Sequence, residues 1–135
     1  MHAALGGLSV AALLAISAPA SAGDRDSHAY KACLDTAGPS ASMLDCTATE
    51  FRRQDAALNT AYGRLMGLMR TVERKRAWRD AQRSWIAFRD AECRAEASEA
   101  IGGSLWGVLF GGCKAELTAQ RARRLEGLAE AERGK

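Results

Sequence analysis

Histidine is scarce in this sequence, which contains 2 histidines among its 135 residues. Both of them, His2 and His28, lie near the amino terminus, so most of the chain has no imidazole to act as a general base. This shortage disfavours Ser-His-Asp and Cys-His catalysis. The cysteines form no Cys-x-x-Cys pair, which also disfavours a zinc site. No spacing of carboxylates indicates an acid–base pair, and we therefore expect no catalytic, cofactor-binding or metal-binding residues.

Strand signals are missing as well. No segment after residue 22 alternates apolar and polar residues for the length of a strand, while helical periodicity recurs from Cys46 onward. Val, Ile and Thr are sparse, and Ala, Leu, Arg and Glu are abundant. This composition is typical of helices, so the sequence predicts an all-α protein.

Charge is absent from the first residues until Asp24. An apolar run at residues 3–16 is followed by small residues, and Ala20-Ser21-Ala22 fits the rule for signal-peptide cleavage. The run is shorter than the roughly 20 residues that span a bilayer. We therefore predict a secretory signal peptide at residues 1–22 and one domain at residues 23–135.

The residue after the predicted cleavage point is Gly23, whereas a lipoprotein would need a cysteine there. The predicted product is therefore a soluble periplasmic or secreted protein that does not insert into the membrane. Its length suits one small domain, to which disulfide bonds would add stability.

Residues that cap or break helices divide the chain after residue 26. A short helix is expected at residues 27–36, because Ser27 or Asp26 can cap it and Gly38-Pro39 ends it. After a connector at residues 40–42, a second helix is expected from about Met43. It carries a heptad-like apolar seam, made of Leu58, Tyr62, Leu65, Met69 and Val72.

No glycine or proline separates this second helix from the next segment, so one rod up to Ile101 is formally possible. Such a rod would be far longer than ordinary helices and would have nothing to pack against. Thr71 can serve as an N-cap, and Glu73 suits the first turn of a helix. We therefore predict a break at Thr71 and a third helix that folds back as an antiparallel hairpin. One face of it carries Trp78, Ala81, Trp85, Phe88 and Glu92.

The segment Ile101–Cys113, IGGSLWGVLFGGC, contains five glycines and is predicted to be a loop. A phosphate-binding loop is disfavoured, because the Lys-Ser/Thr ending and the preceding strand are missing. Its aromatic and aliphatic side chains are expected to close one end of the bundle, and Trp106, Leu109 and Phe110 form a candidate interface. A last helix is predicted from Cys113 or Lys114 to about Ala131.

Several motifs occur in a specific order along the chain. They are Cys33 and Cys46; Leu58-Asn59 followed by Tyr62 and Leu65; Ala81-Gln82-Arg83-Ser84-Trp85 followed by Phe88-Arg89-Asp90 and Cys93; and Cys113, Thr118, Arg121 and Leu125. In this order they resemble the lysozyme inhibitor LprI-like N-terminal domain family, over roughly residues 30–128. The resemblance implies a small exported bacterial helical domain. It also leads us to expect that the protein could inhibit lysozyme.

The predicted hairpin sets an expected register, in which residues equally far from the turn at Arg70-Thr71 face each other. Arg89 then lies level with Asp55, which could accept a bidentate bond. Gln82 lies level with Asn59 and Tyr62. We therefore predict a structural polar network, made of Asp55, Asn59, Tyr62, Gln82 and Arg89. An anion pocket centred on Arg89 is the alternative.

The four cysteines favour two disulfides in an exported protein, and three pairings are formally open. In the same register Cys93 lies one helical turn away from Cys46, which is awkward for a bond that needs Cα atoms within about 7 Å. We therefore predict local pairs, Cys33 with Cys46 and Cys93 with Cys113.

The formal net charge is +3, and most of the basic residues lie after residue 50. Their interleaving with acidic residues at helical spacing disfavours nucleic-acid binding. Binding to a basic lysozyme would need a local acidic surface. The two candidate sets are Asp35, Asp45 and Glu50, and Glu92, Glu96 and Glu99.

These features together favour a non-enzymatic exported module without a cofactor, which binds a protein partner in the cell envelope. Lysozyme inhibition is the specific version of this hypothesis. The alternative is a structural or stress-protective envelope protein with no affinity for lysozyme. The oligomeric state is left open.

Overall fold

The computed structural model describes residues 27–135, which form an all-α fold as predicted. The predicted signal peptide lies outside these residues. The elements are α1 (His28–Thr36), α2 (Ser40–Leu68), α3 (Val72–Glu96), the short 3-10 helix η1 (Ser98–Ala100) and α4 (Trp106–Arg133). No helix in this range is both long and apolar enough to cross a membrane.

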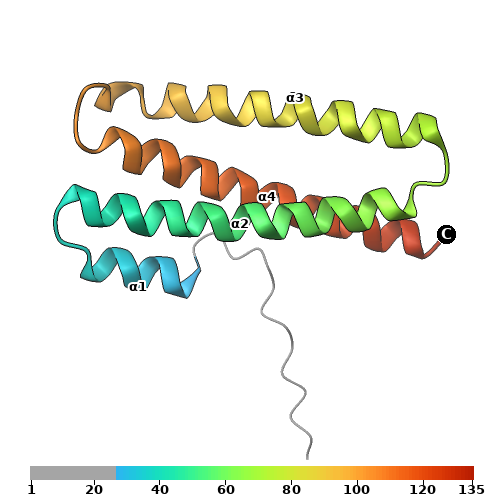
Figure 1. The fold of residues 1–135 in the computed structure, drawn as a ribbon, viewed down its shortest axis with the longest axis horizontal. Coiled ribbons are helices and arrows are strands. Elements are labelled where there is room, and N and C mark those ends of the chain that lie inside the picture. The colour runs from blue at the N-terminus through green and yellow to red at the C-terminus, as the bar shows by residue number, and fades with distance from the viewer. Residues whose placement is uncertain (1–26) are drawn as a thin grey trace, which may run out of the picture.

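Three long helices run up, down and up along one elongated bundle (Figure 1). α2 and α4 point in the same direction and α3 in the opposite one, while α1 folds back beside the first half of α2. One end of the bundle therefore contains the α1–α2 and α3–α4 connections. The other end contains the α2–α3 turn and the carboxyl terminus.

The helix boundaries follow from local capping. Ser27 Oγ accepts a hydrogen bond from the Tyr30 backbone N–H at 3.0 Å, and α1 begins at the next residue. Thr71 Oγ1 accepts from the Arg74 N–H at 3.2 Å, so the predicted break at Thr71 is confirmed. The predicted start of α2 near Met43 is wrong by a turn, because the helix begins at Ser40, directly after Pro39.

The main core lies between α2 and α4, where small side chains let two parallel helices approach closely. Leu58, Leu65 and Leu125 are almost fully buried there. The alanines that surround them, Ala61, Ala119, Ala122 and Ala129, are equally buried. A methyl group takes little space between two helix axes, so these positions allow a short separation while the leucines fill the remaining volume.

The predicted loop at Ile101–Cys113 is wrong in its second half, because α4 already begins at Trp106. Gly107 and Gly111 lie within this helix and face α2. A Cβ atom on Gly111 would come within 2.7 Å of the Thr47 Cγ2 methyl. The glycines therefore allow helix contact instead of breaking the helix. Within residues 27–135, only Gly102 has a positive φ, at 81°, where the connection turns.

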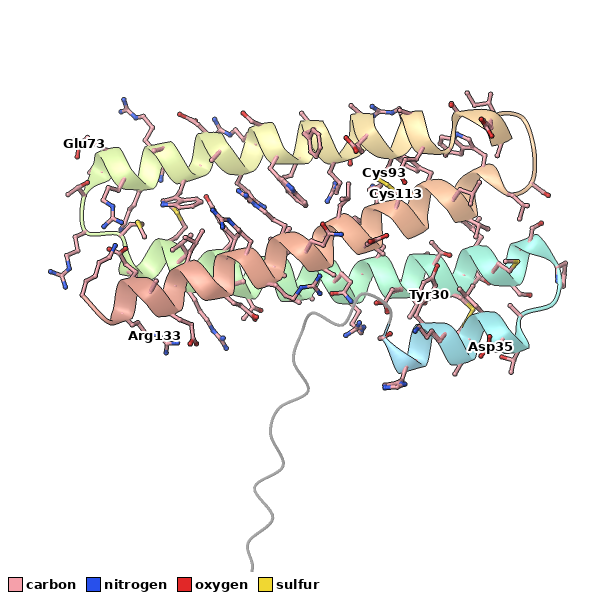
Figure 2. All side chains as sticks on the ribbon, turned by 180° about the vertical axis from the view of Figure 1, so that it is seen from behind. Tyr30, Asp35, Glu73, Cys93, Cys113 and Arg133 are labelled. Carbon is pink, nitrogen blue, oxygen red and sulfur yellow. A yellow bond between two sulfur atoms is a disulfide. The ribbon has the colours of Figure 1, made fainter. Side chains whose placement is uncertain are left out.

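The predicted hairpin of the second and third helices is correct in direction but not in its contacts. α3 does run antiparallel to α2, but α4 lies between them over the half of the bundle nearest the α3–α4 connection (Figure 1). Only Arg89 and Cys93 of α3 are buried. Trp78 and Trp85 are half-buried and pack against the core between α2 and α4. α3 is thus held to the other helices mainly by long side chains, which fill the space in Figure 2.

Candidate functional site

The five residues of the predicted polar network do not come together. Asn59 Nδ2 donates to Asp55 Oδ2 at 3.3 Å, which is a contact within α2. Gln82 Oε1 accepts instead from Arg121 Nε of α4 at 3.1 Å. Tyr62 is half-buried against the core. The network is therefore divided among separate parts of the bundle.

Arg89 does not pair with Asp55. Its Nε and Nη2 donate to Asp90 Oδ1 at 2.9 and 2.8 Å, and its Nη1 donates to Thr118 Oγ1 at 3.3 Å. The physical reason is the position of α4, which presents Thr118 to α3 where the predicted register placed α2. Asp90 is the next residue in the chain, so the sequence contained this partner although the register pointed elsewhere.

Cations and aromatic rings alternate in the space between α3 and the other helices. The Arg89 guanidinium lies 5.3 Å from the ring centres of both Phe51 and Trp85. Lys114 Nζ lies 4.4 Å from the centre of Phe51, and Arg121 lies 5.5 Å from that of Trp85. Burial, with a smaller contribution from nearby Arg124, lowers the pKa of Arg121. The guanidinium and ammonium groups therefore join three helices, and this set is structural.

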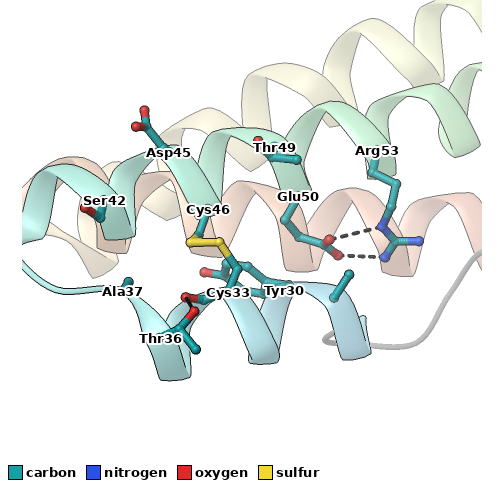
Figure 3. A pocket seen from close by; sticks show the side chains of 11 residues that line it. Tyr30, Cys33, Thr36, Ala37, Ser42, Asp45, Cys46, Thr49, Glu50 and Arg53 are labelled. Carbon is teal, nitrogen blue, oxygen red and sulfur yellow. Dashed lines mark hydrogen bonds and ion pairs between the residues drawn. A yellow bond between two sulfur atoms is a disulfide. The ribbon is translucent and has the colours of Figure 1, made fainter.

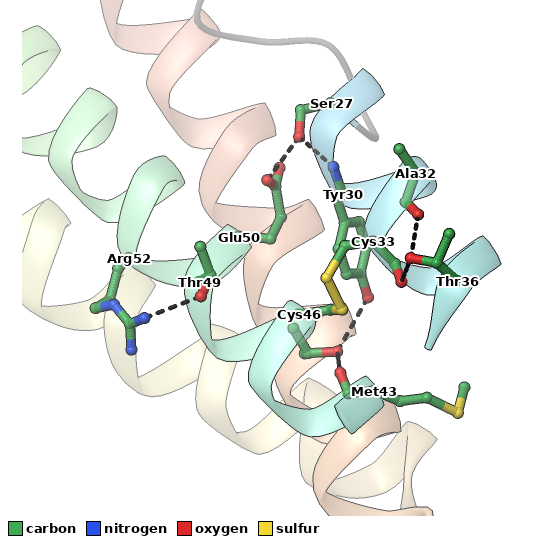
Figure 4. The surroundings of a disulfide bond; sticks show 11 residues. Ser27, Tyr30, Ala32, Cys33, Thr36, Met43, Cys46, Thr49, Glu50 and Arg52 are labelled. Atoms are coloured by element: carbon green, nitrogen blue, oxygen red, sulfur yellow. Dashed lines mark hydrogen bonds between the residues drawn. A yellow bond between two sulfur atoms is a disulfide. The ribbon is translucent and has the colours of Figure 1, made fainter. Parts of the chain in front are cut away.

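The structure pairs the cysteines as the sequence predicted. Cys33 bonds to Cys46 with a Cα separation of 5.8 Å, and Cys93 bonds to Cys113 with 5.5 Å (Figures 2 and 4). The first bond attaches α1 to α2, where Tyr30 Oη and Thr47 Oγ1 are also 3.2 Å apart. The second bond fixes both ends of the α3–α4 connection.

A cavity of about 400 Å³ lies between α1 and α2, beside the Cys33–Cys46 bond (Figure 3). Asp45 and Glu50 are the acidic residues that line it. Glu50 accepts hydrogen bonds from Arg53 at 2.7 Å, Gln54 at 2.7 Å and Ser27 at 2.8 Å. Burial by itself would raise the pKa of Glu50, but these donors outweigh burial and lower it to about 2.

This environment decides what Glu50 can do. A carboxylate with such a low pKa holds no proton near neutral pH, so Glu50 is unsuited to general acid catalysis. It is also buried, and its oxygens are occupied by Arg53, Gln54 and Ser27. Its predicted place in an acidic surface is therefore wrong, and Glu50 instead holds α1 against α2. Among residues 27–135, no three His, Cys, Asp or Glu side chains form a group that could hold a metal ion.

The bundle end that contains the α3–α4 connection exposes apolar side chains. Ile101 is 73% exposed and Leu109 is 50% exposed, and Leu44 and Leu105 are exposed beside them. Leu44 lies against the first turn of α4, because a Cβ on Gly107 would be 3.1 Å from its Cδ1 atom. We call the set Leu44, Ile101, Leu105 and Leu109 the apolar end.

The predicted interface coincides with this surface only in part. Leu109 belongs to it, whereas Trp106 and Phe110 are half-buried and stack on each other with ring centres 4.9 Å apart. These two rings are therefore less exposed than the residues of the apolar end. Leu44, Ile101 and Leu105 were missed, because a single aliphatic residue carries no sequence signal that separates exposed from core positions.

Carboxylates outnumber cations at this end. Residues 32–51 and 94–113, which form the end, contain five carboxylates and one cation, Arg94 in the last turn of α3. Glu50 is buried, and the other four are exposed; these are Asp35, Asp45, Glu96 and Glu99. The apolar end is therefore bordered by acidic residues, although the whole chain is positively charged.

Fold and surface together define a small disulfide-linked helical bundle with one apolar, acidic end. The family described as Lysozyme inhibitor LprI matches residues 32–125, and the chain belongs to this family. It is also similar to an uncharacterised protein from Rhizobium meliloti (strain 1021). The two are 33% identical over 145 residues, which cover 96% of this chain and 97% of that protein. No solved structure matches the chain.

Proposed function

We propose that this protein is an exported, non-enzymatic binding module of the cell envelope, and that its apolar end binds a basic protein, specifically a lysozyme. The observation that carries the proposal is the coincidence of exposed apolar side chains with a border of carboxylates. Apolar anchors provide most of the binding energy in protein interfaces. Charges at the rim mainly set the association rate and the choice of partner.

The acidic border also resolves the conflict with the net charge of the chain. A net charge of +3 would slow the approach of a basic protein, if the charges were evenly spread. The carboxylates at the apolar end instead give a local attraction, because Debye screening limits the influence of charges more than about 10 Å away. A basic partner is therefore directed to this end of the bundle.

The anchoring of the α3–α4 connection supports the same proposal. Ile101 lies at the turn next to Gly102, and the Cys93–Cys113 bond joins the two helices on either side. A connection held in place in this way loses less conformational entropy when it binds. Two disulfides in so short a chain also fit an exported protein.

The experiment is a lysozyme turbidity assay with the chain that remains after removal of residues 1–22. Ile101→Arg/Leu109→Arg should weaken inhibition by at least about tenfold, because it replaces two of the four apolar anchors with cations. The matched control is Ile86→Arg/Phe88→Arg, which changes two exposed apolar residues on α3 by the same charge. This control should inhibit like the unmodified chain.

Two results would contradict the proposal. Unchanged lysis at a large molar excess of the unmodified protein would remove lysozyme as the partner, and would favour the structural or stress-protective alternative. Equal losses in the two double variants would show that inhibition does not depend on the apolar end.

A further inference from the structure

The opposite end of the bundle is strongly basic. It consists of residues 64–83 and 121–135, which contain 12 lysines and arginines and five carboxylates. These segments meet where the α2–α3 turn lies beside the carboxyl terminus (Figure 1). We call this surface the basic end, and it gives the molecule opposite charges at its two extremities.

Ion pairs neutralise only part of the basic end. Arg74 Nη1 lies 2.7 Å from Glu132 Oε1, and Lys135 shares the same carboxylate at 3.1 Å. The bonds from these two cations lower the pKa of Glu132 to about 2. Within the described part of the chain, five exposed arginines at this end have no carboxylate partner; these are Arg64, Arg70, Arg76, Arg79 and Arg124.

Helix stability does not explain where these cations lie. Positive side chains are favourable near the carboxyl ends of α2 and α4, so Arg133 and its neighbours need no further reason. The start of α3 is different, because Arg74, Lys75 and Arg76 follow Val72 and Glu73 at the positive end of the helix dipole. Cations are disfavoured there. Glu132 compensates Arg74, but Lys75 and Arg76 have no carboxylate partner within the described residues. A local rule broken without such a contact points to a role outside the fold.

The tip of the basic end adds an apolar side chain. Val72 is 63% exposed in the first turn of α3, next to the cations that follow it. The same end contains a cavity of about 400 Å³, lined by Arg70, Arg74 and the last residues of α4. An exposed apolar residue surrounded by cations is typical of a surface that contacts lipid headgroups.

We propose that the basic end docks onto a membrane surface that carries anionic phospholipid headgroups. The free arginines bind the headgroup phosphates, and Val72 enters the interfacial layer without crossing it. A nucleic acid fits less well, because the one aromatic side chain in these segments, Trp78, packs against the core and offers no stacking platform. This inference is independent of the proposed lysozyme binding.

Docking in this way would orient the molecule. α2 contains 29 residues, and at 1.5 Å per residue it is about 43 Å long. A bundle that stands on its basic end would therefore hold the apolar end about 40 Å from the membrane and pointing away from it. Both ends could then be occupied at once.

The test is co-sedimentation of residues 23–135, which contain every described element, with two kinds of vesicle. One kind is phosphatidylcholine alone, and the other also contains phosphatidylglycerol. We expect binding to the second kind only, with release as salt is added. Since one cation near an anionic surface contributes about fivefold in binding, Arg70→Gln/Arg76→Gln/Arg79→Gln should bind about 100-fold more weakly.

The matched control is Lys31→Gln/Arg52→Gln/Arg94→Gln, which lowers the net charge by the same amount at exposed positions outside the basic end. It should retain most of the binding, and circular dichroism verifies that both triple variants are folded. Absence of binding to phosphatidylglycerol vesicles, equal binding to both kinds of vesicle, or equal losses in the two triple variants would overturn the proposal. Tighter binding to a single-stranded oligonucleotide than to vesicles would overturn the choice of lipid.

Discussion

Gly111→Ala is expected to destabilise the protein, although the same change stabilises most exposed helix positions. Gly111 lies in α4 where this helix crosses α2, and a new Cβ would stand 2.7 Å from Thr47 Cγ2. The Thr47 side chain cannot move away freely. Its Oγ1 donates to the Met43 carbonyl at 2.9 Å and lies 3.2 Å from Tyr30 Oη.

Two effects of opposite sign determine the magnitude. Replacing glycine by alanine in a helix contributes about 1 kcal/mol of stability. Overpacking a close contact costs about 1–3 kcal/mol. Gly127, also in α4, has open space where a Cβ would stand, with no neighbouring atom within 4 Å, so Gly127→Ala should show the gain alone. The difference between the two variants therefore isolates the steric cost.

Thermal unfolding followed by circular dichroism measures this difference. Since 1 kcal/mol changes the Tm of a domain of this size by roughly 5 °C, Gly111→Ala should melt about 5–15 °C below Gly127→Ala. Thr47→Ser removes the methyl group and keeps the hydroxyl, so it should relieve the strain in the Gly111→Ala background. If Gly111→Ala is as stable as Gly127→Ala, or if Thr47→Ser brings no relief, the close α2–α4 contact is refuted.

Two further predictions concern charged side chains. In a double-mutant cycle measured by urea denaturation, Arg89→Met and Asp90→Asn should be coupled by about 1 kcal/mol. Arg89→Met and Asp55→Asn should instead be additive within about 0.5 kcal/mol. Coupling of Arg89 to Asp55 and not to Asp90 would restore the predicted hairpin register. Because the pKa of Glu50 is about 2 in the folded protein and 4.5 ordinarily, its contribution to stability is full above pH 4.5 and is lost as the pH falls toward 2. The loss should amount to about 3 kcal/mol, and an acid titration of Glu50→Gln should lack it.

The features that local chemistry determines could be predicted from the sequence. Ser27 and Thr71 can cap helices whatever surrounds them, so the start of α1 and the break before α3 were predictable. The disulfide pairs were also predictable, because cysteines that are close in the chain need little else to bring them together.

The features that depend on helix contacts could not be predicted. The sequence does not distinguish a glycine that breaks a helix from a glycine that lets another helix approach. The prediction of a loop at Gly107 and Gly111 was therefore wrong. The predicted partners of Gln82 and Arg89 were wrong, because a hairpin register considers only α2 and α3. The actual partners, Arg121 and Thr118, come from α4. The predicted interface was incomplete for a similar reason, since Leu44 reaches the apolar end from α2.

The parallel pairing of α2 and α4 has a consequence for how the chain is made. Leu58 belongs to the same cluster as Ala122 and Leu125, which follow it by more than 60 residues. A ribosome delivers the chain from the amino end, so α2 is complete long before its partner exists. Its apolar stripe stays open to water, or to a chaperone, until the last helix emerges. A chain that stopped before α4 would have α1, α2 and α3 but no core. Such a nearly complete chain would therefore not form even a partly stable fold.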